Sequence, residues 1–128
     1  MPKPVLLTLD DDPEVLRAVE RDLRKRYADR YRIVRSDSGA TALQSLETLK
    51  KRNEAAALFL VDQRMPEMTG LALLRRLNAA GHTIPSLLIT GLPEPGVAEQ
   101  ARELGALDVL SKPIDWEKLL KLVAYAMQ

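Results

Sequence analysis

LFLVDQRMPEMTG, residues 58–70, is the stretch that decides the fold of this chain. Its apolar start, residues 58–61, ends on the carboxylate of Asp62, and a short loop containing Pro66 and Gly70 follows. An apolar run of this length between turn residues is typical of a strand buried on both faces, as in a parallel sheet. Such a strand delivers Asp62 to its carboxyl end, where open α/β sheets bind ligands. A carboxylate there needs a cationic partner, because burying an unpaired charge is unfavourable.

The sequence on both sides of this stretch alternates between short apolar runs and amphipathic segments. Strands are expected over residues 5–9, 31–35, 58–62, 86–90 and 108–110. Helices are expected over about residues 13–27, 40–49, 70–80, 97–104 and 115–127, the first of them capped by Asp12 with Pro13 as its first residue. Five strands alternating with five helices predict a doubly wound parallel sheet with helices on both faces, joined by right-handed crossovers.

Composition supports a single domain over residues 1–128. The chain is 46% hydrophobic and 29% charged, with a formal net charge of +1. These values are ordinary for a globular protein and offer no general attraction to nucleic acid or membrane. No apolar stretch reaches the length of a transmembrane helix. Cysteine is absent, so disulfides and thiol chemistry are excluded, and a cytoplasmic location is expected.

The first predicted helix has a strongly basic polar side. Its basic residues are Arg17, Arg21, Arg24, Lys25 and Arg26. Such a run is common on a solvated helix face, and this is the interpretation that we favour. A docking face for an acidic partner is the alternative.

Polar residues lie at or just after the ends of four of the predicted strands. They are Asp10 with Asp11, then Asp62, Thr90 and Lys112. In a doubly wound sheet these positions share one rim, and three close carboxylates repel one another unless a divalent cation lies among them. Mg²⁺ suits such a site because it prefers oxygen ligands and takes one or two carboxylates together with phosphate oxygens. Asp62, alone at the end of the central strand, is the best candidate for a nucleophile that forms an aspartyl phosphate.

With these residues in this order, the chain resembles the receiver domain of two-component response regulators over essentially its whole length. The matching motifs are Asp10-Asp11, the loop Asp62-x-x-Met65-Pro66-x-Met68-x-Gly70, Thr90-Gly91 and Lys112-Pro113. Each motif is weak alone, but all of them in order, each after a predicted strand, are highly specific. The resemblance implies a flavodoxin-like (βα)5 fold with strand order 2-1-3-4-5.

The resemblance also implies a phosphoryl acceptor. Asp62 would accept the phosphoryl group from a histidine kinase or a phosphotransfer protein, while Thr90 would hydrogen-bond that group and Lys112 would pair with it. The Lys112–Pro113 peptide bond is expected to be cis, which is uncommon for X–Pro bonds in folded proteins. The family's usual dimer face, formed by the last two helices and the strand between them, makes a homodimer possible.

A magnesium site belongs to the same resemblance. Asp11 and Asp62 would bind Mg²⁺ directly, Asp10 would bind it through water, and the backbone carbonyl of Arg64 would complete the protein ligands. Mg²⁺ is therefore the expected cofactor.

Three positions depart from the family pattern. The residue three before Lys112 is usually Tyr or Phe and is Val109 here, which excludes a switch by aromatic rotation; the alternative is that valine simply suits a buried strand. Arg64 and Leu92 occupy the positions that tune phosphoryl lifetime. Arg64 could screen the phosphoryl group and Leu92 offers no group to orient water, so slow loss of phosphate is predicted. The alternative for Arg64 is a surface ion pair with a carboxylate such as Glu67.

His82 is the only histidine in the chain. It follows Gly81 in a polar loop, so a surface position without a functional role is expected rather than a phosphorelay site.

The favoured function is a phosphorylated signalling module that switches a protein-interaction surface. It would catalyse only its own phosphotransfer and dephosphorylation and would not be an enzyme otherwise. Two alternatives stay open: a degenerate receiver that binds partners without phosphorylation, and a phosphatase of the haloacid-dehalogenase class that uses Asp10 and Asp12. Asp12 is better explained as a helix cap, which argues against the phosphatase. The chain either acts alone through protein contacts or is a piece of a longer protein.

Overall fold

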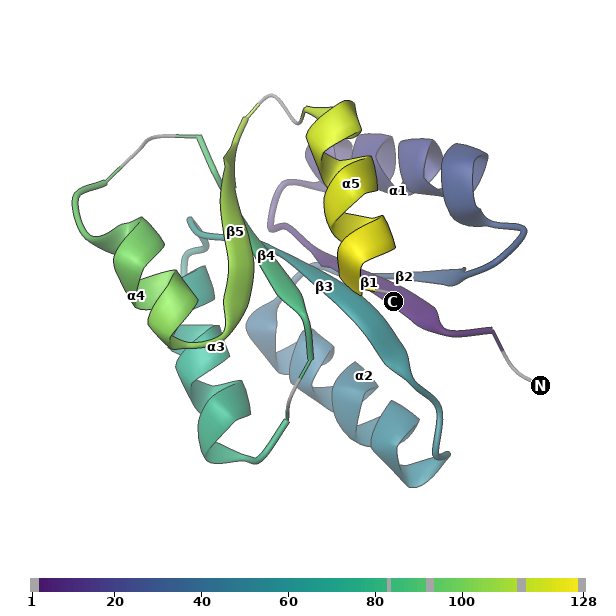
Figure 1. Ribbon diagram of the computed structural model, residues 1–128. Helices are drawn as coiled ribbons and strands as arrows, with labels where there is room; N and C mark the ends of the chain where they lie inside the picture. Colours follow the sequence, from purple (N-terminus) through teal and green to yellow (C-terminus); the bar gives the residue numbers. More distant parts are fainter. Residues whose placement is uncertain (1–2, 83, 92–93, 113–114, 127–128) are drawn as a thin grey trace.

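The structure, a computed structural model, describes residues 3–82, 84–91, 94–112 and 115–126. Within this part of the chain, five strands alternate with five helices (Figure 1). The strands are β1 (Val5–Leu9), β2 (Arg32–Ser36), β3 (Ala56–Asp62), β4 (Ser86–Thr90) and β5 (Ala106–Ser111). The helices are α1 (Pro13–Tyr27), α2 (Gly39–Lys51), α3 (Gly70–Ala79), α4 (Val97–Glu103) and α5 (Trp116–Ala126). None of these helices is long and apolar enough to cross a membrane.

The strands form one parallel sheet in the order β2-β1-β3-β4-β5, which confirms the predicted fold. Helices α1 and α5 cover one face of the sheet, and α2, α3 and α4 cover the other (Figure 1). A separate apolar cluster fills the space on each face. β2 lies on one side of β1, and β3, β4 and β5 follow on the other side, so the strand order switches between β1 and β3. The carboxyl ends of these two strands border the crevice where ligands bind in such folds.

The central strand β3 explains why the stretch that opened the sequence is continuously apolar. Phe59 and Val61 pack into the cluster under α2, α3 and α4, whereas Leu58 and Leu60 pack into the cluster under α1 and α5. Each of these four side chains is at most 1% exposed. Because both faces of β3 are covered, no position in the run can be polar without a buried partner.

Four helices begin at a side-chain cap after the loop that follows a strand. Each cap accepts a hydrogen bond from a backbone N–H of the first turn: Asp12 for α1, Ser38 for α2, Thr69 for α3 and Asp115 for α5. Such caps satisfy N–H groups that have no partner within the helix. They fix where each helix leaves the rim of the sheet.

Some strand ends differ from those expected from the apolar runs. β2 is shifted by one residue to end at Ser36, β3 begins at Ala56, and β5 spans Ala106–Ser111. The reason is pairing: Val5 lies opposite Ala56, and Ser86 lies opposite Ala106. Hydrogen bonding to a neighbouring strand therefore extends strands into residues that are not strongly apolar. β2 is an edge strand, and Arg32 and Arg35 are its exposed residues.

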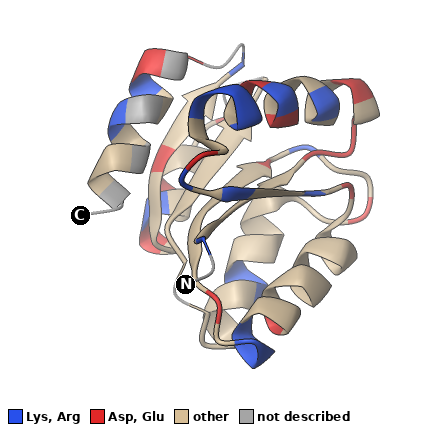
Figure 2. Ribbon diagram, turned by 90° about the vertical axis from the view of Figure 1, so that its right-hand side faces the viewer, with Lys and Arg blue, Asp and Glu red and all other residues tan. Residues whose placement is uncertain are grey.

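The basic residues of α1 are exposed, and Figure 2 shows blue segments at several positions along this helix. Arg24 Nε lies 3.0 Å from Glu20 Oε1, and Arg35 of β2 lies 3.1 Å from Glu20 Oε2. Exposed ion pairs of this kind contribute little to stability. A solvated face with local pairing is sufficient to explain this side of the helix.

Candidate functional site

Three carboxylates meet at the rim formed by the carboxyl ends of β1 and β3. One oxygen from each of Asp10, Asp11 and Asp62 lies within 4.8 Å of the others. Asp10 is 6% exposed and Asp62 is 5% exposed, whereas Asp11 is open to solvent. The structure therefore brings together the three acidic residues that the sequence placed at strand ends.

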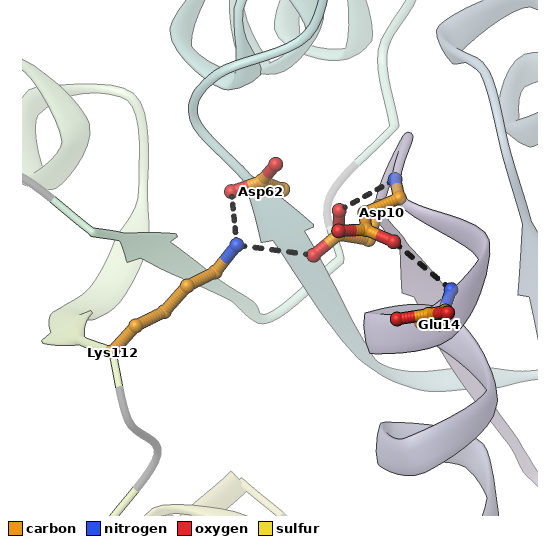
Figure 3. Close-up of polar contacts among 5 residues, drawn as sticks. Asp10, Glu14, Asp62 and Lys112 are labelled. Carbon is orange, nitrogen blue, oxygen red and sulfur yellow. Dashed lines mark hydrogen bonds and ion pairs between the residues drawn. The ribbon is translucent and has the colours of Figure 1, made fainter.

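Lys112 reaches the same site from the segment after β5. Its Nζ lies 3.2 Å from Asp10 Oδ2 and 3.2 Å from Asp62 Oδ1, so it contacts both carboxylates at once (Figure 3). Its backbone N–H donates to the carbonyl of Thr90 at 2.9 Å, which holds Lys112 beside the end of β4. A single ammonium faces three carboxylates, so negative charge remains in excess.

Burial and the neighbouring charges both change the pKa values of Asp62 and Lys112. Burial raises the pKa of Asp62 above its usual value, and the neighbouring Asp10 and Asp11 add to the rise, while Lys112 opposes it. Burial acts to lower the pKa of Lys112, but the carboxylates of Asp10 and Asp62 outweigh it and raise that pKa. The shift of the Asp62 pKa therefore reflects burial first and the neighbouring carboxylates second, whereas the shift of the Lys112 pKa reflects those carboxylates.

Thr90 occupies the same rim as the last residue of β4. It is 4% exposed and lies opposite Ser111 in the pairing of β4 with β5. The residue before it, Ile89, lies opposite Asp62 in the pairing of β3 with β4. Thr90, which carries a hydroxyl group, therefore lies on the strand between the one that carries Asp62 and the one that leads to Lys112.

Gln63 holds the loop after β3, a role that the sequence analysis missed. Its side chain is buried, and its Oε1 accepts a hydrogen bond from the N–H of Leu71 at 3.0 Å. Its own N–H donates to the carbonyl of Ile89 at 2.9 Å, and its carbonyl accepts from the N–H of Gly70 at 3.1 Å. The available signal was an amide side chain directly after a buried strand and before a helix start.

Gly70 allows α3 to begin directly against the end of β3. A Cβ at this position would lie 2.6 Å from Leu88 Cδ1, 2.8 Å from the backbone oxygen of Asp62 and 3.1 Å from Val61 Cγ1. Two of these neighbours belong to the strand that carries the central carboxylate. The absence of a side chain at Gly70 therefore sets the position of Asp62 relative to α3.

Of the three positions that depart from the family pattern, the structure describes Arg64 and Val109. Arg64 Nη2 lies 3.7 Å from Glu94 Oε1, in the loop after β4, rather than beside Glu67. Val109 is partly buried in β5 and packs against the apolar cluster. Leu92 and Pro113 lie outside the described residues. Their assigned properties, like the ligand role of the Arg64 carbonyl, stay predictions.

His82 is only partly exposed, so its ring is more covered than the sequence suggested. Its side chain is only 8% exposed, and its Nε2 lies 3.0 Å from Glu47 Oε1 of α2. The N–H of His82 also donates to the carbonyl of Leu77 at 2.9 Å, which turns the loop back toward α3. The sequence showed a polar loop but not that this loop folds its ring against a neighbouring helix.

Asp12 serves as a helix cap, and we expect its replacement to affect stability alone. Its Oδ1 accepts a hydrogen bond from the N–H of Glu14 at 3.0 Å. Asp12→Ala should lower the free energy of unfolding by about 1 kcal/mol, the usual effect of losing an N-cap, as measured by urea denaturation. Asp29→Ala, which removes a 75% exposed carboxylate, is the control and should change stability little. If Asp12→Ala instead abolished hydrolysis of a phosphomonoester, that result would support the phosphatase alternative.

The doubly wound sheet and its acidic rim define a class of protein, the response regulator receiver domain. The family model of this domain matches residues 6–124, so the chain belongs to this family. Receiver domains are signalling domains of two-component systems. The degenerate-receiver and phosphatase alternatives are not favoured by this match.

Named relatives are response regulators of greater length. The chain is 33% identical to the transcriptional regulatory protein ZraR of Escherichia coli (strain K12), over 89% of this chain and 24% of ZraR. It is 34% identical to the response regulator protein TmoT of Ectopseudomonas mendocina, over 97% of this chain and 53% of TmoT. The chain thus spans about a quarter to a half of the length of these relatives.

Solved structures show the same fold. The response regulator StyR has a TM-score of 0.83 and 26% identity, over 98% of this chain and 60% of StyR. The signal receiver domain of an HD domain-containing protein from Pseudomonas fluorescens Pf-5 has a TM-score of 0.83 and 25% identity, over 98% of this chain and 94% of that chain.

Proposed function

We propose that this chain is a magnesium-dependent phosphoacceptor with Asp62 as its nucleophile. The observation that supports the proposal is the convergence of Asp10, Asp11, Asp62 and Lys112 on one rim, in a chain of the receiver family. The donor would be a phosphohistidine on a histidine kinase or a phosphotransfer protein, because receiver domains interact with such partners. Residues 1–128 would form this one domain and work in the cytoplasm.

The donor set fits a magnesium ion. Asp10, Asp11 and Asp62 supply oxygen donors at compatible spacing, and Asp11 makes no hydrogen bond or ion pair with any other residue that the structure describes. These three residues would hold the ion, with the backbone carbonyl of Arg64 as a further ligand. Bound Mg²⁺ would offset the carboxylates and the charge on the incoming phosphoryl oxygens.

Phosphotransfer would proceed by attack of an Asp62 carboxylate oxygen on the phosphorus atom. The new P–O bond forms as the P–N bond to the donor histidine breaks, and the departing nitrogen keeps the electron pair and takes up a proton. Lys112 would pair with one phosphoryl oxygen and the Thr90 hydroxyl would donate to another, which stabilises charge that develops during transfer. In hydrolysis, water attacks phosphorus, the bond to Asp62 breaks and inorganic phosphate leaves.

The output surface would be formed by α4, β5 and α5. Asp108 of β5 lies 3.4 Å from Arg102 of α4 and 3.3 Å from Lys118 of α5, so one carboxylate links all three elements. Tyr125 of α5 is 65% exposed, which suits a contact with a partner or with a second copy in a homodimer. Val109 in β5 requires that switching there proceed without aromatic rotation. This domain itself would contact neither nucleic acid nor membrane.

Arg64 and Glu94 should change the lifetime of the phosphoryl group in opposite directions. Their ion pair, with Arg64 Nη2 3.7 Å from Glu94 Oε1, would compete with a contact between the Arg64 guanidinium and the phosphoryl group. Arg64→Ala should speed phosphoryl loss by about threefold, and Glu94→Gln should slow it by freeing Arg64 to screen the group, since exposed charge contacts of this kind are worth up to about 1 kcal/mol. Single-turnover release of inorganic phosphate measures both rates. Changes in the same direction for both variants would contradict the assigned role of Arg64.

The test of the proposed function is the intact mass of the chain after incubation with acetyl phosphate. One phosphoryl adduct that needs Mg²⁺ and is removed by hydroxylamine is the expected result. An unmodified mass, together with an NMR spectrum that beryllofluoride leaves unchanged, would refute the proposal in favour of phosphate-independent binding. Continuous release of phosphate from p-nitrophenyl phosphate would instead indicate a phosphatase.

A further inference from the structure

A cavity of about 310 Å³ lies between α1 and the ends of β1 and β4. Asp62 and Lys112 line one part of it, so it adjoins the phosphorylation site proposed above. Its volume is at the lower end of the range of small-molecule sites in proteins. It is therefore large enough for a ligand with about one aromatic ring.

The described walls of this cavity are mainly apolar. They include the side chains of Leu9, Val15, Ala18, Val19 and Ile89. Val15 and Ala18 are only partly buried and lie on the same side of α1, three residues apart. Apolar surface lining an open cavity favours an occupant with an apolar body, because such an occupant removes that surface from water.

The charged residues on the same walls favour a ligand that carries a positive charge. Among the described lining residues, the carboxylates are those of Asp10, Asp22 and Asp62, and the one ammonium is that of Lys112. Lys112 already contacts both Asp10 and Asp62. Asp22 has no hydrogen bond or ion pair with any residue that the structure describes. It lies one helical turn beyond Ala18, so an unpaired carboxylate borders the apolar wall.

We propose that this cavity binds a small amphipathic cation. The apolar body would lie between Val15 and Ala18 of α1 and Ile89 of β4, and an ammonium or amidinium group would pair with Asp22. An apolar wall that ends at an unpaired carboxylate fits this class of ligand and disfavours a neutral or anionic one. Binding does not depend on phosphotransfer, so the inference can fail or hold separately from the proposed function.

The test uses three probes that share one ring and differ in charge: benzylammonium, benzyl alcohol and benzoate. ¹H–¹⁵N spectra of the full chain would be followed during titration with each. Benzylammonium should shift the amides of Val15, Ala18, Asp22 and Ile89 and bind at least about threefold more tightly than benzyl alcohol, with benzoate weakest. Asp22→Asn should make the affinities for benzylammonium and benzyl alcohol equal.

Two further variants control this test. Ala18→Leu fills the cavity with a residue of high helix propensity and should abolish the shifts from both ring probes, with folding checked by far-UV circular dichroism. Asp29→Asn removes an exposed carboxylate at the end of α1 and should leave the preference for ammonium unchanged. Equal affinities for the three probes in the unaltered chain, shifts confined to other amides, or undiminished binding to Ala18→Leu would each overturn the inference.

Discussion

Replacing Asp62 with Asn should abolish the phosphoryl adduct while making the metal-free protein more stable. The amide cannot attack phosphorus as a carboxylate oxygen does, so no adduct is expected at any concentration of acetyl phosphate. The substitution also removes one of three mutually repelling charges at a buried position. A rise of about 1 kcal/mol in the free energy of unfolding is expected at neutral pH without Mg²⁺, within the normal range for single substitutions.

The pH dependence of stability follows from the raised pKa of Asp62. In the pH range above about 4, the folded state retains a proton on Asp62 that the unfolded state has already lost. The free energy of unfolding therefore falls as pH rises through this range. Asp62→Asn should remove that part of the decline, as measured by urea denaturation at a series of pH values without metal.

Asp37→Asn is the matched control for this variant. Asp37 is an exposed carboxylate in the loop before α2, so its loss should leave both the adduct and the pH profile nearly unchanged. An adduct that persists in Asp62→Asn would place the nucleophile elsewhere. A variant less stable than the unaltered chain without Mg²⁺ would contradict the charge balance inferred for the site.

Gly70→Ala should destabilise the fold by about 3 kcal/mol and lower Tm by about 10 °C. Alanine normally strengthens a helix relative to glycine, so propensity alone predicts the opposite sign. Here the added Cβ would lie 2.6 Å from Leu88 Cδ1 and 2.8 Å from the backbone oxygen of Asp62. The second neighbour is backbone and cannot rotate away, so either α3 or the end of β3 must shift. Thermal unfolding followed by circular dichroism measures the effect.

Gly39→Ala is a close control, because Gly39 and Gly70 each follow the N-cap of their helix. A Cβ at Gly39 would lie 3.2 Å from Met68 Sδ, and methionine is flexible enough to adjust. Its effect should stay within about 0.5 kcal/mol. If both alanine variants were equally stable, the close approach at Gly70 would not be what positions Asp62.

The elements that could be predicted from the sequence are those whose signals are local. Apolar runs located the strands, and Asp12 before Pro13 located the start of α1, because capping involves residues two or three apart. The alternation of strands and helices, with the family resemblance, was enough for the sheet order. Strand ends were less accurate, since Ala56 joins β3 by pairing with Val5 rather than by its own propensity.

Contacts between distant segments are what the sequence could not show. The ring of His82 contacts Glu47 of α2, and the partner of Arg64 proved to be Glu94 rather than the nearby Glu67. Gln63 has no motif of its own, and its hydrogen bonds become evident only when β4 and α3 are in place. In each case the decisive neighbour is set by tertiary packing.

The position of β1 inside the sheet has a consequence for how the chain folds. One edge of β1 pairs with β2, and its other edge pairs with β3, which lies later in the chain. Lys112 contacts Asp10 across 102 residues of chain. Contacts between such distant residues form late and slowly in folding. A partly folded chain therefore lacks the assembled cluster of Asp10, Asp62 and Lys112. Only fully folded molecules would accept phosphoryl groups, so newly synthesised or damaged copies would not contribute to signalling.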